Sequence, residues 1–225
     1  NGEIFVAWPA MNSRTIRVRK SADGGVSFGT SVVVAATQAA CEFPLPAQEL
    51  REVWLYLSAA ADLGAGPCAN SIYLAWTDAS DPTTEADPNA SHARVRVASS
   101  RDAGATWTVT TPHPTADVKT VDRWNPFIAV GADDTVLVIC YDTRNWTDRS
   151  GVDVDCAYST DGAQTWSTPR RVTPVTSPHI ADPFQFGDYN GLDIVLNDLI
   201  ASYTDNRRES GGAGDSIDVC ASGIA

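Results

Sequence analysis

The sequence predicts an all-β fold, a β-propeller of four-stranded antiparallel blades with four blades visible, from two observations. An eight-residue motif, Ser-x-Asp-x-Gly-x-Ser/Thr-aromatic, recurs at 21–28, 100–107 and, with one change, 159–166. Apolar strands close with an aromatic residue at intervals of 68, 65 and 62 residues, at Trp8, Trp76, Tyr141 and Tyr203. A repeat of this length, rich in β-branched and aromatic residues and separated by Gly/Asp turns, indicates propeller blades.

The motif encodes a tight turn. Its Asp accepts backbone N–H bonds, its Gly supplies unusual backbone angles, its Ser or Thr caps the turn, and its aromatic ring is expected to anchor the turn in the core. The third copy has Ala163 where the others have Gly25 and Gly104. We interpret the motif as structural, which makes three carboxylates poor catalytic candidates: Asp23, Asp102 and Asp161.

We name the strands of a blade A to D from the central axis outward. One domain over 1–225 is divided into blades 1–36, 53–111, 126–174 and 187–225. Blade one starts with its B strand at 3–8, and blade two is expected to have strands at 53–57, 72–76, 94–98 and 106–110. For blade three we expect strands at 127–130, 135–141, 152–158 and 170–173, and for blade four at 192–196, 199–203 and 217–221. Helix is expected to be nearly absent, with 48–52 as the one plausible helical turn.

The three motif copies resemble the Asp-box, or BNR repeat, of sialidase-like β-propellers. The resemblance covers three of the four expected blades and implies a six-bladed propeller. Blade one lacks an A strand and blade four lacks a D strand, so neither gap fills the other. We therefore expect this chain to be a portion of a propeller that is completed by the remaining blades of the parent protein. An unusual small or self-assembling ring is the alternative.

Composition excludes several classes of partner. The formal net charge of −12 and the isoelectric point near 4.5 argue against nucleic acid, which normally requires a basic face. No apolar run approaches the roughly 20 residues of a membrane-spanning helix, so no membrane insertion is expected. The five cysteines have no zinc spacing, and Cys140 and Cys156 are candidates for a cross-strand disulfide or for buried thiols. We expect an extracellular or cell-surface protein.

Candidate site residues collect on one face of the expected propeller. The D-to-A and B-to-C connections share this face, which we call the loop face, and the Asp-box turns lie on the opposite face. Guanidinium groups, carboxylates and aromatic rings together can bind a sugar or a carboxylated sugar. The predicted substrate-binding residues are Trp76, Arg123, Trp124, Arg144, Asp205 and Arg207. The predicted catalytic residues are Asp142, Asp188 and Tyr189.

Structural alternatives exist for these residues. Local ion pairs that close each B-to-C loop are the alternative for Asp142 with Arg144 and for Asp205 with Arg207. Tyr189 lies between glycines just before an A strand, where it is either a nucleophile, a stacking platform or a core aromatic.

No cofactor is expected. The loop 78–87 carries four carboxylates without EF-hand spacing, which leaves calcium as one alternative and a solvated loop as the other.

The resemblance to sialidases implies particular roles. That family uses an arginine triad for the substrate carboxylate, a Tyr/Glu nucleophile pair and an Asp acid/base. By resemblance, Arg144 and Arg207 are the arginines, Tyr189 is the nucleophile, and Asp142 or Asp188 is the acid/base. The family's Arg-Ile/Val-Pro motif is absent from this chain, and Arg17-Val18-Arg19 does not replace it.

The sequence therefore predicts an extracellular, sialidase-like glycoside hydrolase that acts on a terminal sugar of glycans. A non-catalytic propeller that binds a glycan or a protein is the first alternative. A structural repeat module of a larger surface protein is the second.

Overall fold

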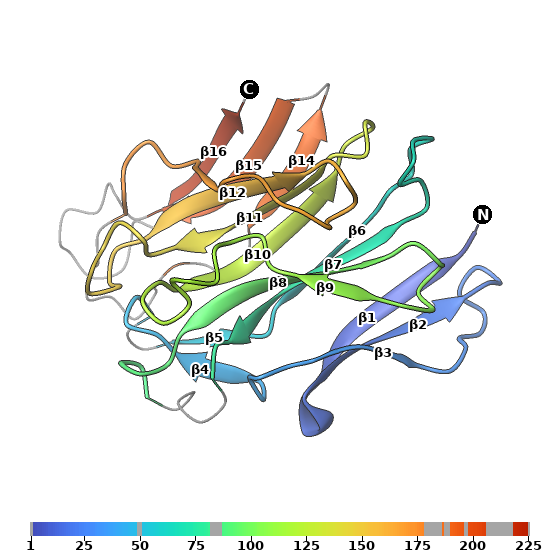
Figure 1. Cartoon of the computed structure of the whole chain (residues 1–225), viewed down its shortest axis with the longest axis horizontal. Coiled ribbons are helices and arrows are strands. Elements are labelled where there is room, and N and C mark those ends of the chain that lie inside the picture. The colour runs from blue at the N-terminus through green and yellow to red at the C-terminus, as the bar shows by residue number, and fades with distance from the viewer. Residues whose placement is uncertain are drawn as a thin grey trace.

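The computed structural model describes residues 2–48, 51–81, 87–177, 186, 190–195, 198–205 and 218–224 (Figure 1). These residues form five antiparallel sheets. The only helix among them is the single 3-10 turn Met11–Ser13, and none of their helices is long and apolar enough to cross a membrane. The predicted helical turn at 48–52 falls partly outside the described residues, and Glu52 begins a strand.

Three of the larger sheets follow the predicted strand order closely. The first sheet contains β1 (Ile4–Ala10), β2 (Thr15–Ser21) and β3 (Val32–Ala36). The next contains β6 (Leu57–Ala61), β7 (Ile72–Ala79), β8 (Ala93–Ser100) and β9 (Thr108–Thr110). The third contains β10 (Arg123–Val130), β11 (Val136–Asp142), β12 (Asp153–Ser159) and β13 (Arg170–Arg171).

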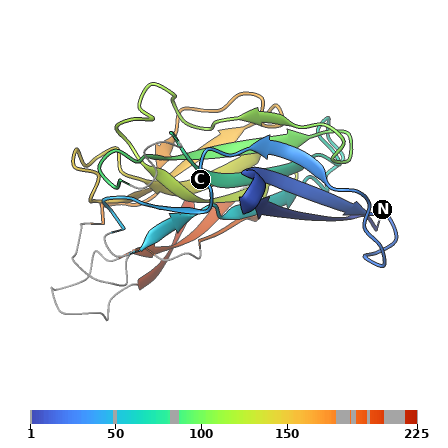
Figure 2. The same cartoon turned by 90° about the horizontal axis from the view of Figure 1, so that it is seen from below.

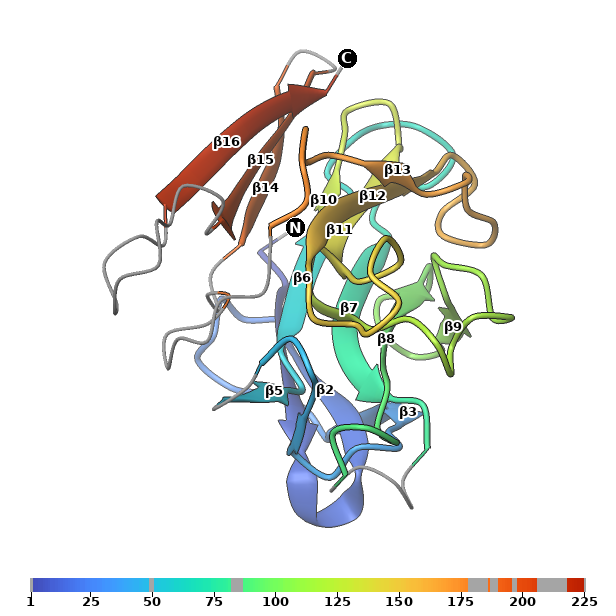
Figure 3. The same cartoon turned by 90° about the vertical axis from the view of Figure 1, so that its left-hand side faces the viewer.

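The last large sheet contains β14 (Gly191–Val195), β15 (Asp198–Asp205) and β16 (Asp218–Ile224). It lies beside the third sheet through contacts between β14 and β10. In Figure 3 the strands β6, β10 and β14 lie toward the middle of the molecule, whereas β9, β13 and β16 lie outward. Viewed from the β1–β3 end, the sheets stand one behind another (Figure 2).

One predicted strand is misplaced. The expected strand at 53–57 is divided, because Val53 pairs with Phe43 in a small sheet made of β4 (Glu42–Pro44) and β5 (Glu52–Trp54). The inner strand of the neighbouring sheet is β6 instead, in which Ala59, Ala60 and Ala61 lack the β-branched signal. Small side chains suit this position because β6 packs directly against β10.

Two apolar clusters hold the sheets together. One lies between the sheets β6–β9 and β10–β13 and contains Tyr73, Val95, Val97, Val138 and Cys140. The other contains residues of all five sheets and includes the fully buried rings of Trp76, Trp124, Tyr141 and Tyr203. Three of the predicted strand-closing aromatics, Trp76, Tyr141 and Tyr203, are therefore core residues.

The three turns of the eight-residue motif, which we call Asp-box turns after the motif that they resemble, have the predicted local bonding. In the second turn, Oδ1 of Asp102 accepts from the Thr106 N–H at 2.8 Å, and its Oδ2 accepts from the Thr106 hydroxyl at 2.5 Å. The Ser100 hydroxyl donates to Oδ1 and accepts from the Gly104 N–H at 2.9 Å. The first and third turns repeat this pattern. The aromatic anchors vary, because Trp107 and Trp166 are half-buried but Phe28 is 38% exposed.

The expected Cys140–Cys156 neighbours do not form a disulfide. Cys140 pairs with Asp155 across the strands, and Cys156 pairs with Ile139. Successive side chains on a strand point to opposite faces, so the two thiols lie in different apolar clusters. The described cysteines whose side chains can be placed, Cys41, Cys68, Cys140 and Cys156, are all free thiols.

Candidate functional site

A cluster of ionisable side chains lies at the loop face, where β10 and β12 begin and β11 ends. Strand pairing brings its members together, since Arg123 on β10 lies opposite Asp142 on β11, and Asp155 lies opposite Cys140. The connection from β9 to β10 adds two more side chains. We call the group the loop-face cluster: His113, Asp117, Arg123, Asp142, Arg144 and Asp155.

A β-bulge orients the first of these strands. The pairing of β10 with β11 shifts between Trp124 and Phe127, and Asn125 adopts a positive φ of 49°. Pro126 follows and has no N–H to offer the ladder. The Asn125 N–H instead bonds the Thr77 hydroxyl of β7 at 3.0 Å, which fixes the start of β10 against the neighbouring sheet. Bulges of this kind redirect side chains at strand ends.

Arg123 is a buried structural cation. Its Nε donates to Oδ2 of Asp142 at 2.6 Å, and its Nη1 and Nη2 donate to the two oxygens of Asp117 at 2.9 and 2.7 Å. The hydrogen bond from Arg123 lowers the pKa of Asp117. All three guanidinium nitrogens already contact carboxylates, and the residue is 3% exposed. The predicted substrate contact of Arg123 has no exposed surface to support it.

Arg144 also bonds buried carboxylates, but it is more exposed than Arg123. Its Nε and Nη2 donate to Asp142 at 3.0 and 2.7 Å, and its Nη2 also bonds Asp155. Two buried carboxylates therefore fix its orientation, but its side chain remains 32% exposed. The Asp142–Arg144 ion pair that was one alternative from sequence is present. A ligand contact by Arg144 stays a prediction, and the exposed part of its guanidinium is where such a contact would form.

Asp142 holds both arginines. It is 1% exposed, and its two oxygens accept from the backbone N–H of Arg144 as well as from the guanidiniums of Arg144 and Arg123. This geometry makes Asp142 a positioning residue for Arg144. The catalytic role predicted for Asp142 stays a prediction.

His113 completes the cluster. Its Nε2 lies 3.5 Å from Sγ of Cys140 and 3.9 Å from Oδ2 of Asp155. Burial, reinforced by Arg123 and Arg144, holds the pKa of His113 well below its usual range, so the imidazole is neutral at neutral pH. Ligand atoms of His113, Asp142 and Asp155 lie within 4.8 Å of one another. The two guanidiniums already occupy these carboxylates, so the trio does not suit a metal ion.

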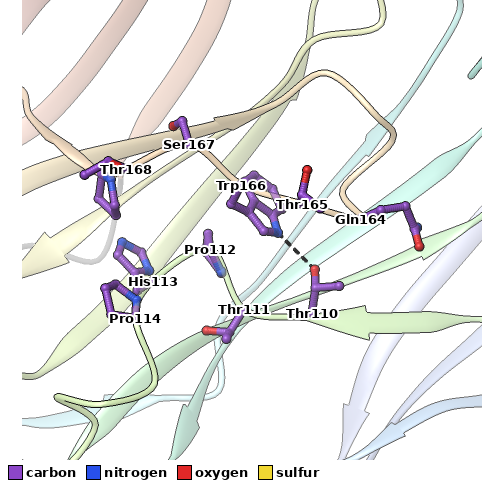
Figure 4. A pocket seen from close by; sticks show the side chains of 11 residues that line it. Thr110, Thr111, Pro112, His113, Pro114, Gln164, Thr165, Trp166, Ser167 and Thr168 are labelled. Atoms are coloured by element: carbon purple, nitrogen blue, oxygen red, sulfur yellow. Dashed lines mark hydrogen bonds between the residues drawn. The ribbon is translucent and has the colours of Figure 1, made fainter.

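A pocket of about 390 Å³ lies beside His113, between residues 110–114 at the end of β9 and residues 164–169 before β13 (Figure 4). Trp166 lies in its wall and donates from Nε1 to the Thr110 hydroxyl at 3.0 Å. The pocket also contains Thr111, Gln164 and Thr165. An aromatic ring beside hydroxyl and amide groups is a surface on which a sugar can stack and form hydrogen bonds.

Two predicted binding residues are core residues instead. Trp76 and Trp124 are both 0% exposed, and the Trp124 ring packs on Tyr141 with the ring centroids 5.3 Å apart. The sequence showed each tryptophan beside a loop but not which side of the strand its ring would occupy. The proposed stacking of a sugar on these two rings is therefore corrected to packing between sheets.

The remaining predicted residues are mostly outside the described part of the chain. Tyr189, Asp188 and Arg207 lie outside the described residues. Asp205 is 2% exposed, and its Oδ1 accepts from the Ser177 hydroxyl at 2.6 Å.

The acidic loop after β7 is also only partly described. Asp78, at its start, accepts from the N–H groups of Gln38 and Ala39 at 2.8 and 3.0 Å and faces Arg94 and Arg96. Residues 82–86 lie outside the described residues. Calcium at this loop stays an alternative from sequence.

Sequence reasoning missed three members of the cluster. Asp153 and Asp155 alternate with Val154 in a strand, and two carboxylates on one face of a buried strand were the available signal for Asp155. Asp117 and His113 gave no comparable signal, because their place depends on how the connection after β9 folds over the sheet.

The arrangement of the sheets compares with solved glycoside hydrolases. The α-L-arabinofuranosidase Arb93A of Fusarium graminearum, in complex with an iminosugar inhibitor, matches with a TM-score of 0.58 and 17% identity over 97% of this chain and 57% of that one. Hadza microbial sialidase Hz136 matches with a TM-score of 0.54 and 12% identity over 98% of this chain and 42% of that one. The fold is propeller-like.

A third solved structure, a protein of unknown function from Dyadobacter fermentans, matches with a TM-score of 0.51 and 14% identity over 92% of this chain and 47% of that one. No family model and no curated protein matches the sequence. At these identities the likeness shows the fold alone, and the propeller-like chain spans about half the length of the solved structures that it matches.

Proposed function

We propose that this propeller-like chain is part of an extracellular glycoside hydrolase that acts on a terminal sugar of glycans, with the loop face as its substrate-binding end. Two solved structures that share the fold are named as an arabinofuranosidase and a sialidase, which supports a sugar substrate. Fold likeness does not by itself assign chemistry, so the proposal depends on the site.

The observation that carries the proposal is that the Arg144 guanidinium is held in one orientation and is still partly exposed. Asp142 and Asp155 are each at most 2% exposed and hold its guanidinium in one orientation, while about a third of the side chain stays accessible. A preoriented, always charged fork of N–H donors is suited to bind a sugar carboxylate or adjacent hydroxyls. Preorganisation of this kind lowers the entropic cost of binding.

The catalytic roles follow the resemblance. Tyr189 is the proposed nucleophile and Asp142 or Asp188 the proposed acid/base, with Arg144 and Arg207 binding the substrate. In such a scheme the tyrosine hydroxyl gives its proton to a partner carboxylate as its oxygen attacks the anomeric carbon, and the acid protonates the departing glycosidic oxygen. Water, which gives a proton to the deprotonated acid, then attacks the anomeric carbon, and the tyrosine leaves and takes its proton back from the partner carboxylate.

A non-catalytic glycan-binding propeller is the second candidate, and one observation favours it. The described carboxylates of the loop-face cluster are committed to arginines: Asp117 and Asp142 bond Arg123, and Asp142 and Asp155 bond Arg144. A binding site requires only Arg144 and an accessible surface, whereas hydrolysis requires a further nucleophile and acid.

Hydrolysis and binding are measured together to separate these candidates. The intact protein is incubated with fluorogenic glycosides that include sialosides and α-L-arabinofuranosides, and it is applied to a glycan array. We expect release of one sugar class, with turnover lost in Tyr189→Phe. Array binding without any turnover would support the second candidate. Neither turnover nor binding would reject both.

A further inference from the structure

A second polar site lies at the opposite end of the interface between the sheets β6–β9 and β10–β13. It is formed by the loop that follows β6 and by the turn between β10 and β11, which lie beside one another in Figures 1 and 3. Asp62 in the loop is 1% exposed and Asp134 in the turn is 6% exposed. Two carboxylates from separate sheets are thus buried at the face away from the loop-face cluster.

Each carboxylate is only half satisfied. Oδ1 of Asp62 accepts from the Gly64 N–H at 2.8 Å, and Oδ2 of Asp134 accepts from the Cys68 N–H at 3.1 Å. Oδ2 of Asp62 and Oδ1 of Asp134 are buried and have no hydrogen-bond partner among the described residues.

Arg101, a basic side chain that reaches Cys68 in the same loop, bonds other groups. Arg101 donates from Nη2 to the carbonyl of Asp161 at 2.7 Å and to Sγ of Cys68 at 3.2 Å. Among the ion pairs of the described residues, none includes Asp62 or Asp134. The two buried carboxylates are therefore without a counter-charge.

Oxygen atoms from the loop after β6 and from the β10–β11 turn converge here. A Cβ atom placed on Gly64 would lie 3.0 Å from Oδ1 of Asp62, 3.3 Å from the carbonyl oxygen of Ala132 and 3.5 Å from Oδ1 of Asp134. The partnerless Oδ1 of Asp134 is thus directed at the same small region as a carboxylate and a carbonyl. Two carboxylates and a carbonyl are hard oxygen ligands of the kind that calcium prefers.

Buried carboxylates without a counter-charge lower the stability of the folded protein. Burial, with a further contribution from Asp134, raises the pKa of Asp62. Two arrangements relieve the repulsion, a cation between the carboxylates or a proton shared by them. The Ala132 carbonyl oxygen at the same place favours the cation, because a proton shared by the two carboxylates makes no use of a third oxygen.

We propose that Asp62 and Asp134 bind a calcium ion that clamps the loop after β6 to the β10–β11 turn. The ion would join two adjacent sheets at the Asp-box face. This site is separate from the sugar-binding surface, so its test does not depend on the proposed function.

Thermal unfolding of the intact protein tests the proposal. After treatment with excess EDTA, millimolar calcium chloride is expected to raise the Tm by about 3–8 °C, as a ligand of the folded state does. Asp134→Asn and Asp62→Asn each remove one ligand charge and should abolish the rise. Because each also removes like-charge repulsion, both variants should fold in EDTA at least as well as the wild type.

Asp133→Asn is the matched control, since Asp133 is an exposed carboxylate in the same turn and should leave the calcium response unchanged. Isothermal titration calorimetry should show one calcium ion per chain, lost in Asp134→Asn. A wild-type Tm unaffected by calcium, with no binding heat, would overturn the proposal. A calcium response that survives in both Asn variants would also overturn it, because the ion would then bind elsewhere.

Discussion

Arg123 and Arg144 both bond Asp142, but they differ in how deeply they are buried and therefore in role. Every guanidinium nitrogen of Arg123 bonds a carboxylate in a residue that is 3% exposed. Arg144 keeps about a third of its side chain accessible. Removing Arg123 would take a fully buried guanidinium from two carboxylates, whereas removing Arg144 would leave Asp155 without its arginine and also remove a surface that a ligand can contact.

The two arginines are expected to respond differently to alanine substitution. Arg123→Ala should cost about 3–5 kcal/mol of unfolding free energy, because Asp142 loses a buried partner. Arg144→Ala should cost less, about 2 kcal/mol, since Asp142 keeps Arg123 although the buried Asp155 loses its arginine partner. Urea denaturation measures both values. Equal losses would contradict the distinction.

Tryptophan burial separates core residues from turn anchors. Trp76 is fully buried, and Trp107 is half-buried with its Nε1 bonded to the Gly104 carbonyl at 3.1 Å. Trp76→Ala should cost about 3–5 kcal/mol, and Trp107→Ala about half of that. The comparison is made by urea denaturation of the two variants. A larger loss for Trp107→Ala would show that the Asp-box ring, and not Trp76, anchors the sheet.

At the scale of elements, the Asp-box turns were the most predictable feature because their bonding is local. Asp161 and Thr165 are four residues apart, and their contacts depend on little beyond the motif itself. The inner strand β6 was not predictable in the same way. Its alanines carry no strand signal, and its position depends on packing against β10.

Gly162 and Gly24 provide a matched test of the turn. Both have left-handed backbones, with φ of 74° and 71°, but a Cβ on Gly162 would overlap Arg101, whereas nothing lies within 4 Å of one on Gly24. Gly24→Ala should therefore cost about 1 kcal/mol from the backbone alone, and Gly162→Ala about 2–3 kcal/mol. Chemical denaturation checks the difference. Indistinguishable losses would mean that Arg101 moves aside freely.

The Asp-box carboxylates predict an acid transition. Hydrogen bonds from the side chain and then the backbone of Thr106 lower the pKa of Asp102 from 3.8 to about 2, and Thr165 does the same for Asp161. A carboxyl group with a lowered folded-state pKa stabilises the fold above its unfolded pKa, and this stabilisation is lost as the pH falls from 3.8 toward 2.

The measurement is the Tm of the wild type and of Asp102→Asn between pH 5 and pH 2. This pH range brackets the interval from 3.8 to about 2 over which the Asp102 carboxyl titrates. The variant should be less stable at the upper end and show a shallower decline. Parallel curves would contradict the assignment.

At the scale of the whole molecule, sequence predicted the fold class and the loop-face location of Arg123, Asp142 and Arg144. It could not place Asp117 or His113, because the connection that carries them has no repeat or periodicity. It also left open whether Asp142 and Arg144 bond one another, and the structure shows that they do. Pairing across strands, which sequence spacing does not encode, brought Asp155 to the same guanidinium.

The central claim is that a propeller-like glycoside hydrolase uses Arg144 at its loop face. The most direct measurement is kcat/KM of the intact protein on its best fluorogenic glycoside, compared between Arg144→Ala and Arg170→Ala. Arg170 is an exposed arginine on β13 of the same sheet but outside the cluster. We predict a loss of about 100-fold or more in Arg144→Ala, as expected when a charged hydrogen-bond donor to substrate is removed, and wild-type values in Arg170→Ala. Equal kcat/KM in the wild type and both variants would contradict the claim.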